Sequence, residues 1–174
     1  MQGRLKWLGV MNEILLKTIV DAEHAAKVLQ AKAPDLEVVS ASLRRHPFAG
    51  FEFHVPALAG RGETARALVD YYSGKAFISD RWESDPVLEV DDVEAVSDPS
   101  WNSISFETAR QRAKALLSTA ALRKARLAWK GGVKETASVE KVWKPNWILD
   151  VRIQGRNYRV IVDGLNGGYF FIES

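Results

Sequence analysis

Three histidines are the side chains best suited to acid–base chemistry near neutral pH, because imidazole titrates there; they are His24, His46 and His54. Their spacing matches neither the His-x-x-x-His nor the His-Glu-x-x-His arrangement of metal-binding helices. Glu52 and His54 stand two residues apart on a segment with strand-like alternation, so they share a face and could act as an acid–base pair. The competing interpretation is a charged, solvent-facing strand surface, which the sequence favours.

The motif Val-Asp-x-x-x-Gly occurs twice, with Asp70 and Gly74 in the first copy and Asp163 and Gly167 in the second. A catalytic or metal-binding role would need converging partners, and none stands nearby in sequence. An aspartate at a strand end can instead accept a backbone N–H two residues on, and a glycine four positions later can take positive φ. The motif therefore predicts two structural turns, in which Asp163→Ala costs roughly 0.5–2 kcal/mol.

Other sequence signatures of catalysis and cofactor binding are missing. The chain has no cysteine, which excludes thiolate nucleophiles and disulfides. Gly131-Gly132 and Gly167-Gly168 lack the spacing and the lysine of a phosphate-binding loop, and no serine-nucleophile motif occurs. We therefore expect no catalytic residue, no cofactor and no metal.

Trp143, Lys144 and Trp147 gather two indoles and an ammonium group around Pro145, between two predicted strands. Trp143 shares a strand face with a lysine two residues earlier, and exposed Trp beside Lys is typical of side chains that dominate interfaces. Alternation along the following strand also fits a core position for Trp147, so both interpretations stay open there. We predict that Trp143, Lys144 and Trp147 bind a partner.

Charge is unevenly distributed along a chain whose formal net charge is +2. The segment 110–130 carries seven basic residues and no acid, whereas 80–98 carries eight acids and a single arginine. A basic helix with Trp129 close to its end could bind nucleic acid through phosphate contacts and base stacking. The alternative is a solvated basic face compensated by the acidic segment.

Apolar residues at three- and four-residue spacing predict helices over 12–33, with Asn12 as N-cap, and over 105–128, with Ser105 as N-cap. Alternating and β-rich segments predict strands at 36–43, 51–55, 65–69, 75–78, 136–143, 148–153, 158–162 and 169–172. Each half of the chain thus reads as a helix followed by about four strands.

The two halves also align with each other. Pro47 matches Pro145, after which residues 51–55 and 149–153 both read apolar, acid, apolar, base, apolar. This predicts an internal duplication, with a first helix-plus-sheet repeat at 1–80, an acidic connector at 81–100 and a second repeat at 101–174.

The order of helix, strands and hairpin ending in Val-Asp-x-x-x-Gly resembles the PepSY and cystatin-like family of small α+β domains. The residues that carry the resemblance are SFETARQRAKALL (105–117) and WILDVRIQGRNYRVIVDGLNGG (147–168). The resemblance implies an α+β fold of two tandem copies, each with one helix packed across a curved antiparallel sheet. The family is associated with protease propeptides, inhibitors and bacterial envelope proteins.

The N-terminal segment has basic residues ahead of an apolar stretch, but polar residues interrupt it and no small-residue cleavage site follows. No apolar run reaches the length of about 18 residues that spans a membrane. We expect a cytoplasmic protein without a membrane span, or a cell-envelope protein whose signal has been removed.

These features together favour a non-enzymatic protein-binding module, of inhibitor or immunity-like type, with an unidentified protein partner. A sheet that carries one helix leaves edges and a face accessible, where a partner can add a strand. Two alternatives stay open: nucleic-acid binding by the basic second helix, and a small enzyme with its site in the concavity of the sheet.

Overall fold

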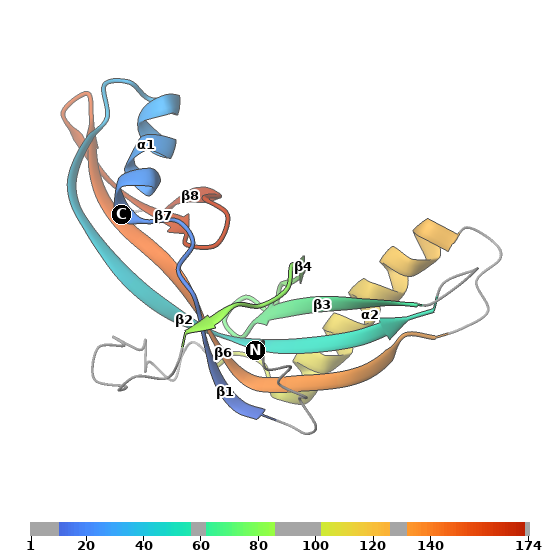
Figure 1. The fold of residues 1–174 in the computed structure, drawn as a ribbon. Coiled ribbons are helices and arrows are strands. Elements are labelled where there is room, and N and C mark those ends of the chain that lie inside the picture. Colours follow the sequence, from blue (N-terminus) through green and yellow to red (C-terminus); the bar gives the residue numbers. More distant parts are fainter. Residues whose placement is uncertain (1–10, 57–61, 86–101, 126–131, 173–174) are drawn as a thin grey trace, which may run out of the picture. The chain divides into compact units, whose positions relative to one another are not determined.

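The computed structural model describes residues 11–56, 62–85, 102–125 and 132–172 (Figure 1). These residues contain two helices, α1 (Ala22–Lys32) and α2 (Phe106–Ala125). Their strands are β1 (Met11–Leu16), β2 (Glu37–Val55), β3 (Glu63–Asp70), β4 (Ala76–Ser79), β5 (Ser84–Asp85), β6 (Lys134–Ile153), β7 (Arg156–Asp163) and β8 (Tyr169–Ile172). The described part of the chain is therefore mainly β-sheet.

Hydrogen bonding orders the strands β4-β3-β2-β6-β1-β5, while β7 pairs with β6 and β8 pairs with β7. The hairpin registers are antiparallel, from Phe48↔Asp70 in β2·β3 and from Asn146↔Asp163 in β6·β7. Among the described strands, β4 pairs only with β3 and β8 only with β7. Both therefore have one open edge, by which we mean an edge that no described strand occupies.

The long strands β2 and β6 each run through a proline, where the sequence predicted two shorter strands. Proline has no N–H and removes a ladder hydrogen bond wherever that donor would be needed. Pro47 and Pro145 stand one residue before the hairpin pairings begin, at Phe48 and Asn146. Neither proline therefore interrupts the pairing with β3 or β7, and each strand continues.

The chain divides into two compact units, which are described separately. In terms of the described residues, unit 1 comprises 11–14, 47–56, 62–83, 102–125 and 132–142. Unit 2 comprises 15–46, 84–85 and 143–172. Most of unit 1 is thus nested in sequence between two segments of unit 2.

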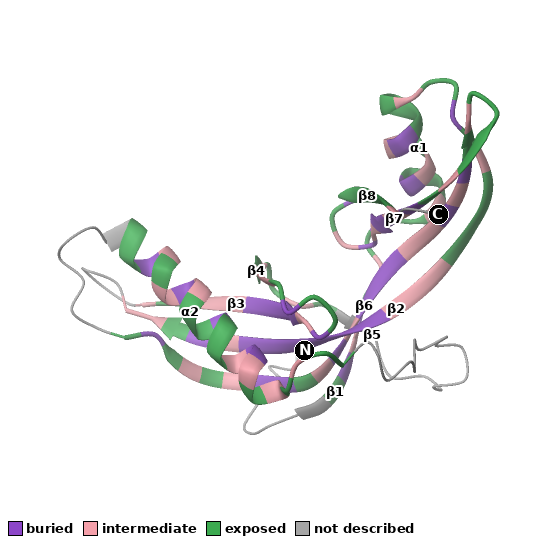
Figure 2. Cartoon of the chain, turned by 180° about the vertical axis from the view of Figure 1, so that it is seen from behind, coloured by how far each residue is buried: buried purple, intermediate pink, exposed green. Residues whose placement is uncertain are grey.

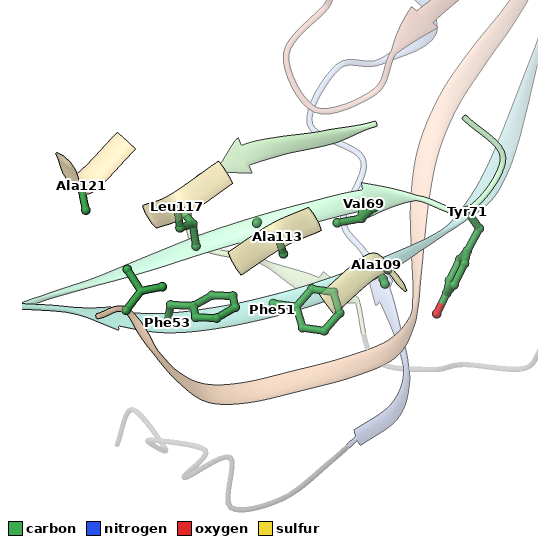
Figure 3. Close-up of a cluster of buried hydrophobic side chains, with 11 residues drawn as sticks. Phe51, Phe53, Val69, Tyr71, Ala109, Ala113, Leu117 and Ala121 are labelled. Atoms are coloured by element: carbon green, nitrogen blue, oxygen red, sulfur yellow. The ribbon is translucent and has the colours of Figure 1, made fainter. Parts of the chain in front are cut away.

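In unit 1, α2 covers one face of β2 and β3 (Figure 3). The helix presents a stripe at four-residue spacing that is mostly alanine: Ala109, Ala113, Leu117 and Ala121. The strands present the alternating side chains Ala49, Phe51, Phe53, Ala67 and Val69, which share one face of the sheet. Small side chains on the helix leave room for the phenylalanines, so the two elements fill a common core.

In unit 2, α1 packs on strands from the C-terminal part of the chain. Ala25 and Leu29 of the helix share a core with Leu149 and Val151 of β6 and Val160 and Val162 of β7. The β6–β7 connection is the two-residue turn Gln154–Gly155, in which both φ angles are positive (48° and 77°). This is the backbone that suits tight hairpins, because its twist matches that of the strands.

The predicted fold of two tandem helix-on-sheet repeats is wrong. The structure is mostly antiparallel sheet with two helices in the described residues, and the units are interleaved along the chain. α1, from the first half, packs on β6 and β7 of the second half, and α2 packs on β2 and β3 of the first half. The physical reason is the continuity of β2 and β6, since each long strand contributes to both units.

The predicted helix over 12–33 is also wrong in its first half, where β1 occupies 11–16. Ile14 and Leu16 are buried at two-residue spacing, which is the period of a strand. The helix begins only after Asp21, whose side chain accepts the backbone N–H of His24 at 2.7 Å and caps it. The sequence did not show where the strand ends and the helix begins, because the apolar residues of this region fit the two-residue period of a strand as well as the period of a helix.

The helix predicted over 105–128 occurs as α2 at 106–125, and residues 126–128 lie outside the described residues. The Ser105 hydroxyl accepts the backbone N–H of Thr108 at 3.1 Å, as an N-cap does. Most of the predicted connector 81–100 likewise lies outside, apart from 81–85, which include β5. Neither described helix has the length and apolar character to cross a membrane.

Candidate functional site

Asp70 and Asp163 occupy turns with the same backbone hydrogen bonds. Their N–H groups donate to Lys75 O (3.0 Å) and Gly168 O (2.7 Å), and their carbonyls accept from the N–H groups of Gly74 and Gly167. Each carboxylate accepts the N–H two residues on, at 2.9 Å in the first turn and 2.8 Å in the second. Gly74 and Gly167 have φ of 69° and 77°, which glycine adopts without a steric penalty.

The second carboxylate oxygen distinguishes the two aspartates. Asp70 Oδ2 accepts the Ser73 hydroxyl at 2.7 Å, whereas Asp163 Oδ2 lies 2.7 Å from Lys144 Nζ. The Lys144 side chain is only 5% exposed, so its ammonium pairs with Asp163 inside unit 2. Burial of a charge is costly unless it is paired and hydrogen-bonded, and the turn aspartate meets that need.

A chain of buried polar groups continues from Lys144. Its Nζ donates to Asn146 Oδ1 at 2.9 Å, and Asn146 Nδ2 lies 2.8 Å from His46 Nδ1. Because the Asn146 amide oxygen faces an ammonium, its NH₂ group faces the imidazole, and His46 Nδ1 acts as the acceptor. The sequence does not reveal this chain, because His46 and Asn146 are a hundred residues apart and nothing in the pattern links His46, Lys144 and Asp163 to one another.

The structure places the predicted partner-binding residues as follows. Trp147 packs against the core of unit 2 and its indole N–H donates to Val20 O at 2.7 Å. Trp143 is partly buried, and Lys144 is buried. Partner binding by these three residues stays a prediction, but Lys144 and Trp147 are engaged within unit 2.

The histidines and Glu52 do not converge on one site. His24 and His54 are exposed on separate units, and His46 is buried in the polar chain of unit 2. Glu52 forms an ion pair with Arg66, its cross-strand partner, at 2.6 Å. In the described part of the chain, no group of three or more His, Asp and Glu side chains could hold a metal.

Basic side chains of α2 are partly engaged within unit 1. The Arg110 guanidinium bonds Glu135 at 2.9 Å and Glu107, and lies 4.8 Å from the centre of the Phe106 ring. Desolvation lowers the pKa of Arg110, but hydrogen bonds to Glu135 and Glu107 outweigh it and the net shift is upward. Arg112 donates to Gly74 O at 2.6 Å. Lys130, Arg126 and Trp129 lie outside the described residues.

Two further pKa shifts have structural causes. Burial, followed by the Glu140 carboxylate, raises the pKa of Tyr71 to about 12, and its hydroxyl donates to Glu140 O. On the outer face of unit 2, hydrogen bonds from Arg159 and then Ser40 lower the pKa of Asp150. Tyr71 belongs to the core of unit 1, and Asp150 is held in a surface ion pair with Arg159 at 2.8 Å. Neither shift marks a reactive group.

The most distinctive surface feature is β8, in which Tyr169, Phe170 and Phe171 are exposed and Ile172 is half-buried (Figure 2). Three consecutive aromatic side chains, Tyr169, Phe170 and Phe171, are 37%, 59% and 47% exposed. Phe171 makes edge contacts with Tyr169 and with Tyr158 of β7, at centroid distances of 6.3 and 5.9 Å. The sequence predicted this strand but not its exposure, because apolar strands are usually buried.

A pocket of about 440 Å³ lies at one end of β8. Its lining includes Ile172, Tyr158 and the ion-paired Asp150 and Arg159. The lining also includes Val39, Val151, Arg152 and Asn157, so apolar, polar and charged groups all border the pocket beside β8. The open edge, the aromatic row and this pocket form one candidate interaction site in unit 2.

No family model, curated protein or solved structure matches the chain.

Proposed function

We propose that the protein is a non-enzymatic module that binds another protein through the exposed aromatic side chains of β8. The observation that carries the proposal is the exposure of Tyr169, Phe170 and Phe171 on a strand with one open edge. Contiguous exposed apolar surface marks interaction sites, whereas single exposed apolar residues are ordinary. Aromatic anchors contribute most to the affinity of protein interfaces.

The arrangement of charges supports binding over catalysis. Three acidic side chains of the described residues form ion pairs: Glu52 with Arg66, Asp150 with Arg159, and Asp163 with Lys144. A general base needs access to a substrate proton, and each of these carboxylates is already in contact with a guanidinium or ammonium group. If the partner protein is a protease or a toxin, binding of this module to it would make the module an inhibitor or an immunity-like protein.

Nucleic-acid binding by α2 has less support. Arg110 is engaged by two carboxylates and Arg112 by the turn at Gly74, so two of the basic side chains have partners inside unit 1. Among the described residues, three of the four large aromatic side chains that are exposed lie on β8 of unit 2, which carries no cationic side chain, and the fourth is Tyr72 of unit 1. Phosphate contacts are what single-strand binding requires beside aromatic platforms.

Site-specific photo-crosslinking tests the proposal. A photoreactive phenylalanine analogue replaces Phe170 in the full chain, which is expressed in its source cells, and the adducts are identified by mass spectrometry. A matched control carries the analogue at Ile78, which is equally exposed but lies in unit 1. We expect a discrete protein adduct from position 170 that position 78 does not give.

The purified partner then binds the wild-type chain, and Phe170→Ala weakens binding at least tenfold, about 1.4 kcal/mol. Raising the salt concentration leaves this affinity nearly unchanged, because β8 carries no charge. The proposal is wrong if both positions give the same adducts, or if Phe170→Ala binds as the wild type does. Steep loss of binding with salt, accompanied by crosslinks to nucleic acid, would favour the basic helix instead.

A further inference from the structure

We infer that β8 binds its partner by strand addition, and that the partner contributes an extended, uncharged, apolar segment. This inference rests on the proposed function and goes further by stating how the backbone takes part and which chemistry the segment has.

The hydrogen-bond phase of the β7·β8 ladder determines which backbone groups face the open edge. Asp163 N donates to Gly168 O at 2.7 Å, and bonded pairs alternate with non-bonded pairs in an antiparallel ladder. Phe170 and Ile172 are therefore the residues that bond β7. The N–H and C=O groups of Tyr169 and Phe171 point away from β7, toward the edge that no described strand occupies.

The side chains of β8 are exposed on both faces of the sheet. Tyr169 and Phe171 stand opposite Val162 and Val160, on the face that α1 covers, and Phe170 stands on the other face. A strand added at this edge would thus meet aromatic neighbours on both of its own faces. Cross-strand pairs of aromatic with aromatic or β-branched side chains stabilise a sheet, so a segment with a run of apolar residues suits both faces of this edge.

The charges on and around β8 decide what kind of segment fits. Tyr-Phe-Phe-Ile has no charge and none of the lysine or proline residues that protect edge strands from pairing. Beside Ile172, Arg159 pairs with Asp150 and Arg152 with Glu37, so an incoming charge that lost water at β8 would compete with ion pairs already formed.

A second copy of β8 fits less well than a flexible segment. Two four-residue strands would pair along only about 14 Å. So short a pairing buries much less surface than the roughly 1,200 Å² that a stable dimer buries. A flexible segment can follow the aromatic row from Tyr169 and Phe171 to Tyr158, which lies on β7.

The experiment uses the full chain and a displayed library of random decapeptides as the probe. We expect enrichment of peptides with at least four consecutive uncharged apolar or aromatic residues. With the most enriched peptide bound, amide exchange at Tyr169 and Phe171 slows at least tenfold, whereas Phe170 and Ile172 are already protected in the free chain.

Two variants separate backbone pairing from side-chain contact. Phe171→Ala removes the ring, and Phe171→Pro removes both the ring and the N–H that points to the open edge, a position where proline is tolerated. We expect Phe171→Pro to bind the peptide at least tenfold more weakly than Phe171→Ala, while exchange at α1 is unchanged in both.

Other outcomes overturn the inference in distinguishable ways. If Phe171→Pro equals Phe171→Ala and the two amides stay unprotected, strand addition is wrong, although the partner crosslinked at position 170 still supports the proposed function. Enrichment of charged peptides refutes the apolar segment. Self-association that Phe171→Pro abolishes, without peptide enrichment, assigns the edge to a second copy. No enrichment together with no adduct at position 170 refutes both proposals.

Discussion

At the scale of single residues, one motif has two different consequences. Asp70 and Asp163 accept the same backbone N–H two residues on, and these contacts are predictable because all the participants lie within a few residues. The ion pair of Asp163 with Lys144 could not be predicted in this way, because it depends on how β6 and β7 pair.

Asp163→Ala should therefore destabilise the protein much more than Asp70→Ala. Removing Asp163 leaves the Lys144 ammonium buried without its carboxylate, which costs about 3–5 kcal/mol, whereas Asp70→Ala loses turn hydrogen bonds worth roughly 0.5–2 kcal/mol. Urea unfolding of the two variants measures the difference. Asp163→Asn, which keeps the turn acceptor, separates the charge from the turn. Equal losses for the two alanine variants would show that the ion pair contributes nothing.

Gly74 and Gly167 form a second matched pair, since both have positive φ. A methyl group at Gly167 would lie 3.7 Å from Val28 Cγ2, so Gly167→Ala costs only the backbone strain, about 1–2 kcal/mol. At Gly74 it would lie 1.8 Å from Arg112 Nη1, and the guanidinium would have to leave Gly74 O. We expect Gly74→Ala to cost about 1.5–3 kcal/mol more, because that hydrogen bond is charge-assisted.

The control is the Arg112→Ala background, in which no guanidinium occupies the space beside Gly74. There the excess cost of Gly74→Ala over Gly167→Ala should vanish in the same thermal or urea unfolding measurements. An excess that persists in this background would place its cause in the turn itself.

At the scale of elements, the sequence predicted α2 and most strands closely, because their periodicity and end signals agree. Ser105 and the four-residue stripe from Ala109 both indicate the same helix. The prediction for the N-terminal region was wrong because the apolar residues among 14–20 (Ile14, Leu15, Leu16, Ile19 and Val20) fit a period of two as well as a helix. The sequence also does not show that β2 continues through Pro47. A proline interrupts a strand only where a neighbouring strand needs its missing N–H as a donor, and the pairing with β3 begins after Pro47.

The start of α1 at Asp21 is testable. Asp21→Ala removes the acceptor of the His24 N–H and should destabilise the helix by about 1 kcal/mol, whereas Asp21→Asn should change stability by only a few tenths. Amide exchange along α1 measures the effect directly. If Asp21→Ala leaves exchange in 22–32 unchanged, the helix does not depend on this cap.

At the scale of the whole molecule, each unit draws its core from parts of the chain that are far apart. Leu29 of α1 packs with Val160 and Val162 of β7, and Leu117 of α2 packs with Ala67 and Val69 of β3. The motif alignment could not reveal this, because it compares the two hairpins and carries no information on which helix covers each of them. The exchange of partners, together with the continuity of β2 and β6, distinguishes the observed fold from tandem repeats.

Leu29→Ala and Leu117→Ala test the exchange. Both leucines are almost fully buried, so each substitution should cost about 2–5 kcal/mol. Native-state amide exchange should accelerate in β7 for Leu29→Ala and in β3 for Leu117→Ala. The reverse pattern, with Leu29→Ala acting on β3, would restore the tandem arrangement.

The pairing of α1 with β7 also determines when this protein can fold during its synthesis. About 130 residues separate Leu29 from Val160, so at roughly 5–20 residues per second the ribosome exposes the apolar face of α1 for on the order of ten seconds before its covering strand exists. The contacts of unit 1 span a shorter interval of the chain, so its core closes first. Through that delay α1 is available to chaperones and proteases, and a pause in translation before β7 would prolong the exposure.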